Sequence, residues 1–179
     1  MYNHQTAVAI LGSQASPSEE MLANASNLSR LFTQAGYVTI TDESNPCASA
    51  IHKSIRSANG TLVVTSPKSE SSFSGAKVLE SPSILGRMEA ILRTSDAILL
   101  LDGGLRSLAI LFQVWSYGSS PNLPFRPLVL LGSSWPQAIE ALRSAGWLTK
   151  NQVAMVTTVN TPEEAVESLR YYAGAKHAD

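Results

Sequence analysis

Hydrophobic residues along the chain fall into two alternating kinds of segment. One kind is a short, uninterrupted apolar run, as in strands that are buried on both faces of a parallel sheet. Such runs lie at residues 7–11, 37–40, 61–64, 97–101, 128–131 and 153–156. The other kind has apolar side chains at helical spacing, which predicts amphipathic helices.

The helical segments alternate with the strand runs. They cover 17–35, 83–94, 107–117, 135–145 and 162–172, and a further helix starts near Asn45-Pro46. Strands that alternate with helices predict βαβ units with right-handed crossovers. The pattern therefore indicates an α/β fold, in which one doubly wound, Rossmann-like domain over residues 1–179 contains a mostly parallel sheet of about six or seven strands.

Residues 65–83 interrupt this pattern, because they are mostly small and polar. The segment follows a predicted strand and precedes a predicted helix, and Val78-Leu79 inside it adds a candidate short strand. Long loops in compact domains are usually functional or disordered. Both possibilities stay open here, so we expect a flexible loop or a lid.

Composition and charge narrow the class of protein. Charged residues make up 15% of the chain, against roughly 25% in ordinary soluble domains, while 25 of the 179 residues are serine. The formal net charge of −1 gives no electrostatic reason to bind nucleic acid or an anionic membrane. Cys47 has no partner for an internal disulfide, and no histidine–cysteine set has zinc spacing. No cationic stretch precedes the first apolar run, as a signal peptide would require, so we expect a cytoplasmic protein without metal, cofactor, nucleic-acid or membrane partner.

The ends of two predicted strands form the strongest candidate ligand site. In an open parallel sheet, ligands bind beyond the carboxyl ends of the strands. Gly12-Ser13 follows the first strand, and Asp102-Gly103-Gly104 follows the strand at 97–101. Glycines let a phosphate approach the main chain, and the helix that follows offers free N–H groups. The alternative for both turns is a plain connection from strand to helix.

Two polar side chains in the next turn add to this candidate site. Arg106 can supply a cation, and Ser107 a hydroxyl group that donates a hydrogen bond to phosphate. Ser107 could equally serve only as the N-cap of a helix.

From Arg87 onward these motifs resemble the LOG (Lonely Guy) family, formerly labelled lysine decarboxylase-like. The family pattern is an Arg-Lys pair, then Ser/Ala-Asp-Ala before an apolar strand, then Pro-Gly-Gly-x-Gly-Thr-x-x-Glu. In this chain Arg87 takes the arginine position, Ser95-Asp96-Ala97 precedes the strand, Gly103-Gly104 match the double glycine, and Ser107 replaces the threonine.

The resemblance implies a Rossmann-like fold and a homodimer that pairs through helices around the site. Active members are phosphoribohydrolases, which cleave the N-glycosidic bond of cytokinin nucleotides or AMP. The related molybdenum-cofactor carrier proteins bind without hydrolysis. A homodimer is also favoured by the segment 107–117, which is more apolar than one buried helix face needs.

Several positions depart from the family pattern. Met88 stands in place of the lysine, Asp102 of the proline, Arg106 of the second-turn glycine and Ile110 of the glutamate. Cleavage of an N-glycosidic bond builds positive charge on the ribose, which a nearby carboxylate stabilises. Isoleucine cannot do this, so the pattern favours loss of the hydrolase activity.

Asp102 and Glu89 remain as candidate catalytic residues that would substitute for the lost carboxylate. Asp102 is expected at the mouth of the crevice, where it could replace the glutamate, pair with Arg106 or Arg87, or bind ribose hydroxyls. The plainer interpretation is that Asp102 caps the glycine turn. Glu89 is expected to be a solvated helix residue.

We therefore expect a non-hydrolytic binder of a nucleotide or other phosphorylated small molecule. The expected binding residues are Gly12, Ser13, Arg87, Gly103, Gly104, Arg106 and Ser107. Two alternatives stay open: an active nucleoside 5'-monophosphate phosphoribohydrolase that uses a substitute carboxylate, and a structural or regulatory dimer without a ligand.

Overall fold

Seven parallel strands form one sheet in the computed structural model, which describes residues 5–118 and 126–175. Their order across the sheet is β4-β3-β2-β1-β5-β6-β7. The strands are β1 (Ala7–Gly12), β2 (Val38–Asp42), β3 (Leu62–Ser66), β4 (Lys77–Glu80), β5 (Ala97–Leu101), β6 (Leu128–Leu131) and β7 (Val156–Val159). Each strand is parallel to its neighbours, so the predicted doubly wound, Rossmann-like α/β fold is confirmed.

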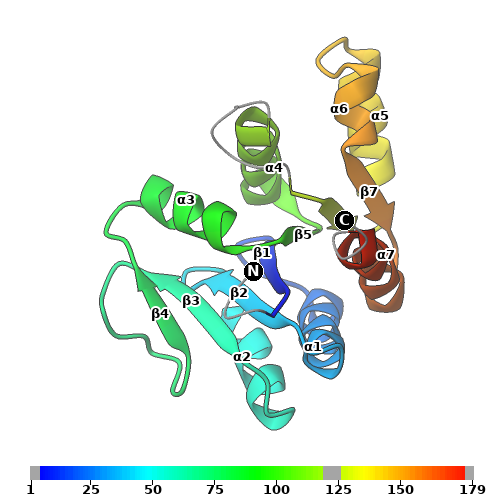
Figure 1. Cartoon of the computed structure of the whole chain (residues 1–179). Helices are drawn as coiled ribbons and strands as arrows, with labels where there is room; N and C mark the ends of the chain where they lie inside the picture. The colour runs from blue at the N-terminus through cyan, green and yellow to red at the C-terminus, as the bar shows by residue number, and fades with distance from the viewer. Residues whose placement is uncertain (1–4, 119–125, 176–179) are drawn as a thin grey trace.

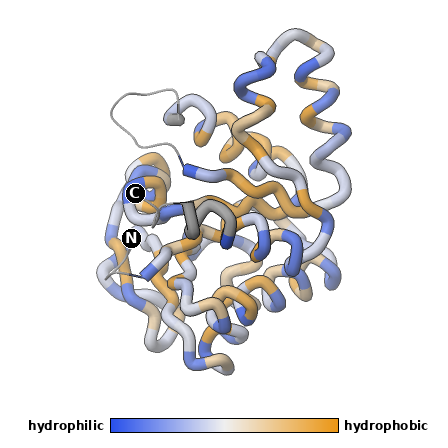
Figure 2. Tube along the Cα trace, turned by 45° about the vertical axis from the view of Figure 1, so that its right-hand side comes forward, coloured by the Kyte–Doolittle hydropathy of each residue, from blue (hydrophilic) through white to orange (hydrophobic). Residues whose placement is uncertain are grey.

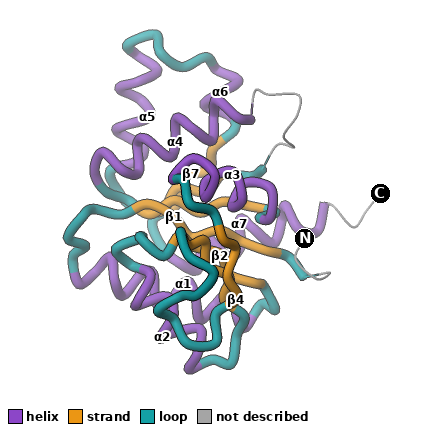
Figure 3. Tube along the Cα trace, turned by 90° about the vertical axis from the view of Figure 1, so that its left-hand side faces the viewer, coloured by secondary structure: helices purple, strands orange, loops and turns teal. Residues whose placement is uncertain are grey.

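Helices cover both faces of the sheet (Figure 1 and Figure 3). They are α1 (Glu19–Gln34), α2 (Ala48–Ser57), α3 (Ile84–Thr94), α4 (Gly104–Gly118), α5 (Trp135–Ser144), α6 (Lys150–Ala154) and α7 (Pro162–Ala175). On one face α1 packs between α2 and α7. On the opposite face α3, α4 and α5 pack against the sheet.

Two apolar layers fill the space between the sheet and the helices, because successive strand side chains point to opposite faces. In β1, Val8 and Ile10 belong to the layer under α1, whereas Ala9 and Leu11 belong to the layer under α3 and α4. Every residue of β1 is buried. This explains the uninterrupted apolar runs, and Figure 2 shows hydrophobic segments gathered at the centre of the molecule.

The position predicted for the last strand is wrong. The apolar run at 153–156 predicts a strand, but α6 extends to Ala154 and β7 begins only at Val156. Thr149 and Gln152 form a reciprocal capping box at the start of α6, which satisfies backbone groups that a strand would have to pair with β6. The strand is therefore shifted toward the C-terminus, where it pairs with β6.

The serine-rich segment 65–83 is structured in part. Lys77–Glu80 form β4, which pairs with β3 and confirms the short strand expected inside the segment. The loop before β4 is attached to Glu43, whose carboxylate accepts hydrogen bonds from the Ser72 N–H and from the hydroxyls of Ser71 and Ser72. The segment therefore has a specific attachment to the loop after β2.

The order of strands switches at β1. From β1 the chain steps to β2, β3 and β4, and then returns to β5 on the other side of β1. Ligands of open α/β sheets bind at such a switch point. Gly12 is in register with Leu101, so the two glycine turns indicated by the sequence lie side by side.

Candidate functional site

The two glycine turns at the switch point are joined by the side chain of Ser107. The Ser13 N–H donates a hydrogen bond of 3.0 Å to the Ser107 Oγ, and this hydroxyl donates to the Leu101 carbonyl, also at 3.0 Å. Ser13 and Ser107 are both fully buried. A serine hydroxyl has one proton, which Leu101 accepts here, so Ser107 binds the protein itself rather than a ligand in this arrangement.

Close packing at this junction requires glycine. Gly12 has a φ of +83°, and a Cβ there would lie 2.6 Å from the Ser107 Oγ. Glycine adopts such φ values without steric cost. We name the buried unit of Gly12, Ser13 and Ser107 the partition, because one cavity lies on each side of it.

The first cavity, about 450 Å³ in volume, opens between α3, α4 and the loop after β2. Arg87 and Arg106 line it together with Asp42, so we name it the arginine cavity. Its other walls are mostly apolar and include Leu11, Ile84, Met88, Ile91, Leu105, Ala109 and Ile110. Ile84 and Leu105 are 74% and 82% exposed, so they form its rim.

An ion pair with Asp42 fixes Arg87 in the arginine cavity. The Arg87 Nε donates to the Asp42 Oδ2 at 2.8 Å, and the two side chains are only 10% and 17% exposed. Burial alone would raise the pKa of Asp42, but hydrogen bonds from Ser44, Thr65 and Arg87 outweigh burial and lower the pKa. Asp42 is therefore ionised at neutral pH.

Arg106 reaches the same cavity from the first turn of α4, which begins at Gly104 rather than at the predicted residue 107. The Arg106 Nη1 donates to the Ser44 carbonyl at 2.8 Å, and the residue is exposed. A guanidinium has five N–H donors, so Arg106 can bind an anion and keep this hydrogen bond. With one aspartate against two arginines, the described lining carries a net positive charge.

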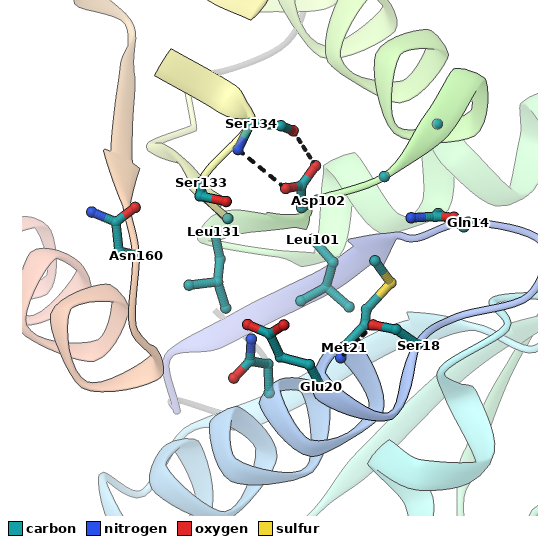
Figure 4. A pocket seen from close by; sticks show the side chains of 14 residues that line it. Gln14, Ser18, Glu20, Met21, Leu101, Asp102, Leu131, Ser133, Ser134 and Asn160 are labelled. Atoms are coloured by element: carbon teal, nitrogen blue, oxygen red, sulfur yellow. Dashed lines mark hydrogen bonds between the residues drawn. The ribbon is translucent and has the colours of Figure 1, made fainter. Parts of the chain in front are cut away.

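The second cavity, about 430 Å³ in volume, lies on the α1 side of the partition (Figure 4). Its charged lining residues are Glu20 and Asp102, and neither lysine nor arginine is among the described residues that line it. We therefore name it the acidic cavity. It is bordered by the starts of α1, α4 and α5, at Ser18, Gly104 and Ser134.

Asp102 lines the acidic cavity and contacts the turn after β6. Its carboxylate accepts hydrogen bonds from the Ser134 N–H at 3.3 Å and from the Ser134 hydroxyl. Gly132 permits this approach, because it has a φ of +138° and a Cβ there would lie 2.2 Å from the Asp102 Cβ. Asp102 therefore fixes the turn before α5 and lines a different cavity from Arg87 and Arg106.

The residues predicted to form one phosphate site are thus divided by the partition. Arg87 and Arg106 line the arginine cavity, whereas Gly103 and Gly104 line the acidic cavity beside Asp102. The other predicted residues form the partition itself. The structure therefore brings the two glycine turns together but separates the glycines from the arginines.

Glu89, the other candidate carboxylate, lines neither cavity. It is exposed on α3 and forms an ion pair of 2.9 Å with Arg93. Asp42 is the carboxylate that sequence reasoning missed, although its place at the carboxyl end of the second strand, beside the switch point, is a signal that could have identified it. Within residues 5–118 and 126–175, no three histidine, cysteine or acidic side chains gather as a metal site would require.

The fold and its switch point define a Rossmann-like α/β domain with a cavity on each side of the partition. Across the part of the chain that the structure describes, no helix has the length and apolar character to span a membrane. No protein-family model and no curated protein matches the sequence.

Solved structures of molybdenum-cofactor proteins share this fold. The molybdenum cofactor binding protein from Rippkaea orientalis aligns with a TM-score of 0.75 at 15% identity, over 96% of this chain and 99% of that one. The Moco carrier protein from Chlamydomonas reinhardtii aligns with a TM-score of 0.75 at 17% identity over the same shares, 96% and 99%. DNA processing protein A from Helicobacter pylori aligns with a TM-score of 0.65 at 14% identity, over 93% of this chain and 80% of that one. The resemblance to the molybdenum-cofactor carriers is thereby confirmed as a shared fold.

Proposed function

We propose that the protein binds a phosphorylated small molecule in the arginine cavity without hydrolysing it. The observation that carries this proposal is the presence of two guanidinium groups, Arg87 and Arg106, beside apolar walls in one cavity. Guanidinium groups bind phosphate oxygens through charge-assisted, often bidentate hydrogen bonds. Apolar walls suit a flat ring, such as a nucleobase or another heterocycle.

The lining of the arginine cavity supports binding rather than cleavage. Ile110 stands where the LOG pattern has its glutamate, and its side chain lines the cavity. Asp42, the carboxylate among the described lining residues, is paired with Arg87 at 2.8 Å. A carboxylate neutralised in this way stabilises a cationic ribose poorly.

The proteins of similar fold favour a small ligand. Two are described as binding or carrying the molybdenum cofactor. The third is described as binding single-stranded DNA, but the net charge of −1 in this chain gives no general attraction for a polyanion.

Isothermal calorimetry with AMP and with inorganic phosphate tests the proposal, with adenine release followed in the same samples. Arg106→Gln removes a charged hydrogen-bond donor, so the affinity for AMP should fall by about tenfold or more. Arg93→Gln is the matched control, because Arg93 is exposed on α3 and lies outside the cavity. The absence of saturable binding, equal loss in both variants, or release of adenine by the unmodified protein would contradict the proposal.

We further propose that two copies of the chain pair through the apolar rim of the arginine cavity. Ile84 and Leu105 on this rim are 74% and 82% exposed, and the neighbouring Leu85 on α3 is 61% exposed. Large apolar side chains that gather on an exposed surface mark interaction sites. Leu105→Glu should convert a dimer to a monomer in sedimentation velocity, whereas Trp147→Glu, at a residue 72% exposed after α5, should not. A wild-type chain that sediments as a monomer at every concentration would exclude this pairing.

A further inference from the structure

We infer that the acidic cavity is a second ligand site, which takes an uncharged polyhydroxylated ring: a free sugar or the ribose of a nucleoside. This inference does not rest on the function proposed for the arginine cavity, because the two cavities lie on opposite sides of the partition. The volume of the acidic cavity, about 430 Å³, is within the range of small-molecule pockets, roughly 300–1,000 Å³.

The charge of the acidic cavity disfavours anions and favours ligands that donate hydrogen bonds. Glu20 and Asp102 line it, and the described lining contains no cationic side chain. An ionised carboxylate has about four acceptor positions. Asp102 uses its oxygens for two hydrogen bonds, both from Ser134, which leaves positions for ligand hydroxyls. Carboxylates accept hydrogen bonds from ribose hydroxyls in dinucleotide-binding folds in the same chemical manner.

The uncharged part of the lining can both donate and accept hydrogen bonds. Gln14, Asn24 and Asn160 contribute side-chain amides, and Ser133 and Ser134 contribute hydroxyl groups. Such groups match a sugar, because each sugar hydroxyl is itself a donor and an acceptor. A simple cation would use the carboxylates but would leave the amide N–H groups unmatched.

The labelled side chains of the lining surround one opening in Figure 4. Asp102 and Ser134 lie on one side of it, and Glu20 on α1 lies across from them. Leu101 and Leu131 lie between the polar groups and offer an apolar surface. The C–H face of a sugar ring would cover this surface and remove it from water.

Gly104 leaves the approach to the acidic cavity clear. It has a φ of +63°, and a Cβ there would meet no atom within 4 Å. The first N–H groups of a helix have no partner within the helix, so the start of α4 can donate to a hydroxyl oxygen of the ligand. The backbone here therefore complements the side-chain acceptors.

The test is a titration of the full chain with D-ribose, D-glucose and adenosine. Two-dimensional amide NMR monitors each titration. We expect saturable shifts at Gly103, Gly104 and Ser134. Binding of either free sugar identifies that source, and binding of adenosine alone identifies the ribose of a nucleoside. No saturable shift with any of the three, or shifts confined to the surroundings of Arg106, would overturn the inference.

Substitutions test whether the ligand binds in the acidic cavity. Asp102→Asn keeps the size of the side chain and removes its charge, so the affinity for the bound sugar or nucleoside should fall by roughly tenfold or more. Asn160→Ala changes an exposed lining position and should lower the affinity for the same ligand. It replaces Asp102→Asn in the test if that variant does not fold. Glu89→Gln is the matched control, because it removes an exposed carboxylate outside the cavity.

Two further measurements separate this site from the arginine cavity. Arg106→Gln should lower the affinity for AMP and leave the sugar-induced shifts at Gly103 unchanged. The proposal for one cavity can therefore fail without the proposal for the other. Ethylammonium or inorganic phosphate that binds in the acidic cavity more tightly than the sugars would overturn the inference.

Discussion

The arginine cavity and the acidic cavity are nearly equal in volume, about 450 and 430 Å³, yet their chemistry is opposite. One has two guanidinium groups within mostly apolar walls, whereas the other has two carboxylates among amides and hydroxyls. The same stretch of chain, residues 102–107, contributes to both cavities and to the partition. One strand-to-helix turn can therefore present two surfaces of opposite charge.

Backbone angles explain the division. Gly103 and Gly104 have φ values of +121° and +63°, so the chain turns sharply as it enters α4. Gly103 and Gly104 line the acidic cavity, whereas Leu105 and Arg106 line the arginine cavity. A motif that is continuous in sequence need not form one site.

The largest effect is expected where the wall of the acidic cavity is most tightly packed. Gly132→Ala adds a Cβ that would lie 2.2 Å from the Asp102 Cβ, at a φ of +138°. Overpacking and backbone strain together should lower the free energy of unfolding by about 2–4 kcal/mol, as measured by urea denaturation. Sugar binding should be lost with it, while AMP binding should survive.

Gly146→Ala is the control for this substitution. Gly146 also has a positive φ, +77°, but a Cβ there would meet no atom within 4 Å. Only the backbone strain remains, so the loss should be about 1 kcal/mol. Equal losses in the two variants would show that the contact with Asp102 has no energetic weight.

An intermediate effect is expected at the partition, whose chain neighbours Gln14 and Arg106 line the acidic and the arginine cavity. Ser107→Ala leaves the buried Ser13 N–H and Leu101 carbonyl without their hydrogen-bond partner. The free energy of unfolding should fall by about 1–3 kcal/mol, and the affinities of both cavities should fall together. Thermal unfolding and the two titrations measure these changes, with the exposed α4 serine variant Ser116→Ala as control. Loss of affinity in one cavity alone would mean that Ser107 does not support both.

The smallest effect concerns Glu43, which follows Asp42 beside the arginine cavity. The Ser66 hydroxyl contributes most, and together with hydrogen bonds from Ser72 and Ser71 it outweighs burial and lowers the pKa of Glu43 from 4.5 to about 2. A lowered pKa in the folded state means that Glu43 stabilises the fold above pH 4.5 and that this contribution is lost as the pH falls toward about 2.

Amide NMR of Ser72 measures this titration directly, since its N–H donates to Glu43 at 2.8 Å. The chemical shift should change with a midpoint near pH 2, and Glu43→Gln should abolish the change. A midpoint near the ordinary glutamate value of about 4.3 would contradict the attachment of the serine-rich segment to Glu43.

The elements of the fold were largely predictable, because burial on both faces of a sheet admits mainly apolar side chains. The runs at 97–101 and 128–131 coincide with β5 and β6. β7 was misplaced, because an apolar run of four residues does not distinguish a strand from a short helix. The capping box of Thr149 and Gln152 favours the helix α6 at this position.

The site was less predictable than the fold. The residue types at Arg87, Arg106 and Gly103 indicated a ligand-binding turn, but not the division between two cavities. That division depends on backbone angles such as the φ of +121° at Gly103 and on the direction of each side chain. Asp42 was missed because its role depends on an ion pair with a residue 45 positions away.

The hydrogen bond between Ser13 and Ser107 also bears on how the molecule assembles, because it joins residues 94 positions apart. Closing so long a loop costs chain entropy, which is offset only when non-local strands pair. Each cavity is lined by residues within this loop and by residues beyond it, so a chain that ends ahead of α4 contains neither cavity in complete form. Ligand binding at either cavity would therefore report that β1 and β5 have paired, and would distinguish the native state from partly folded forms.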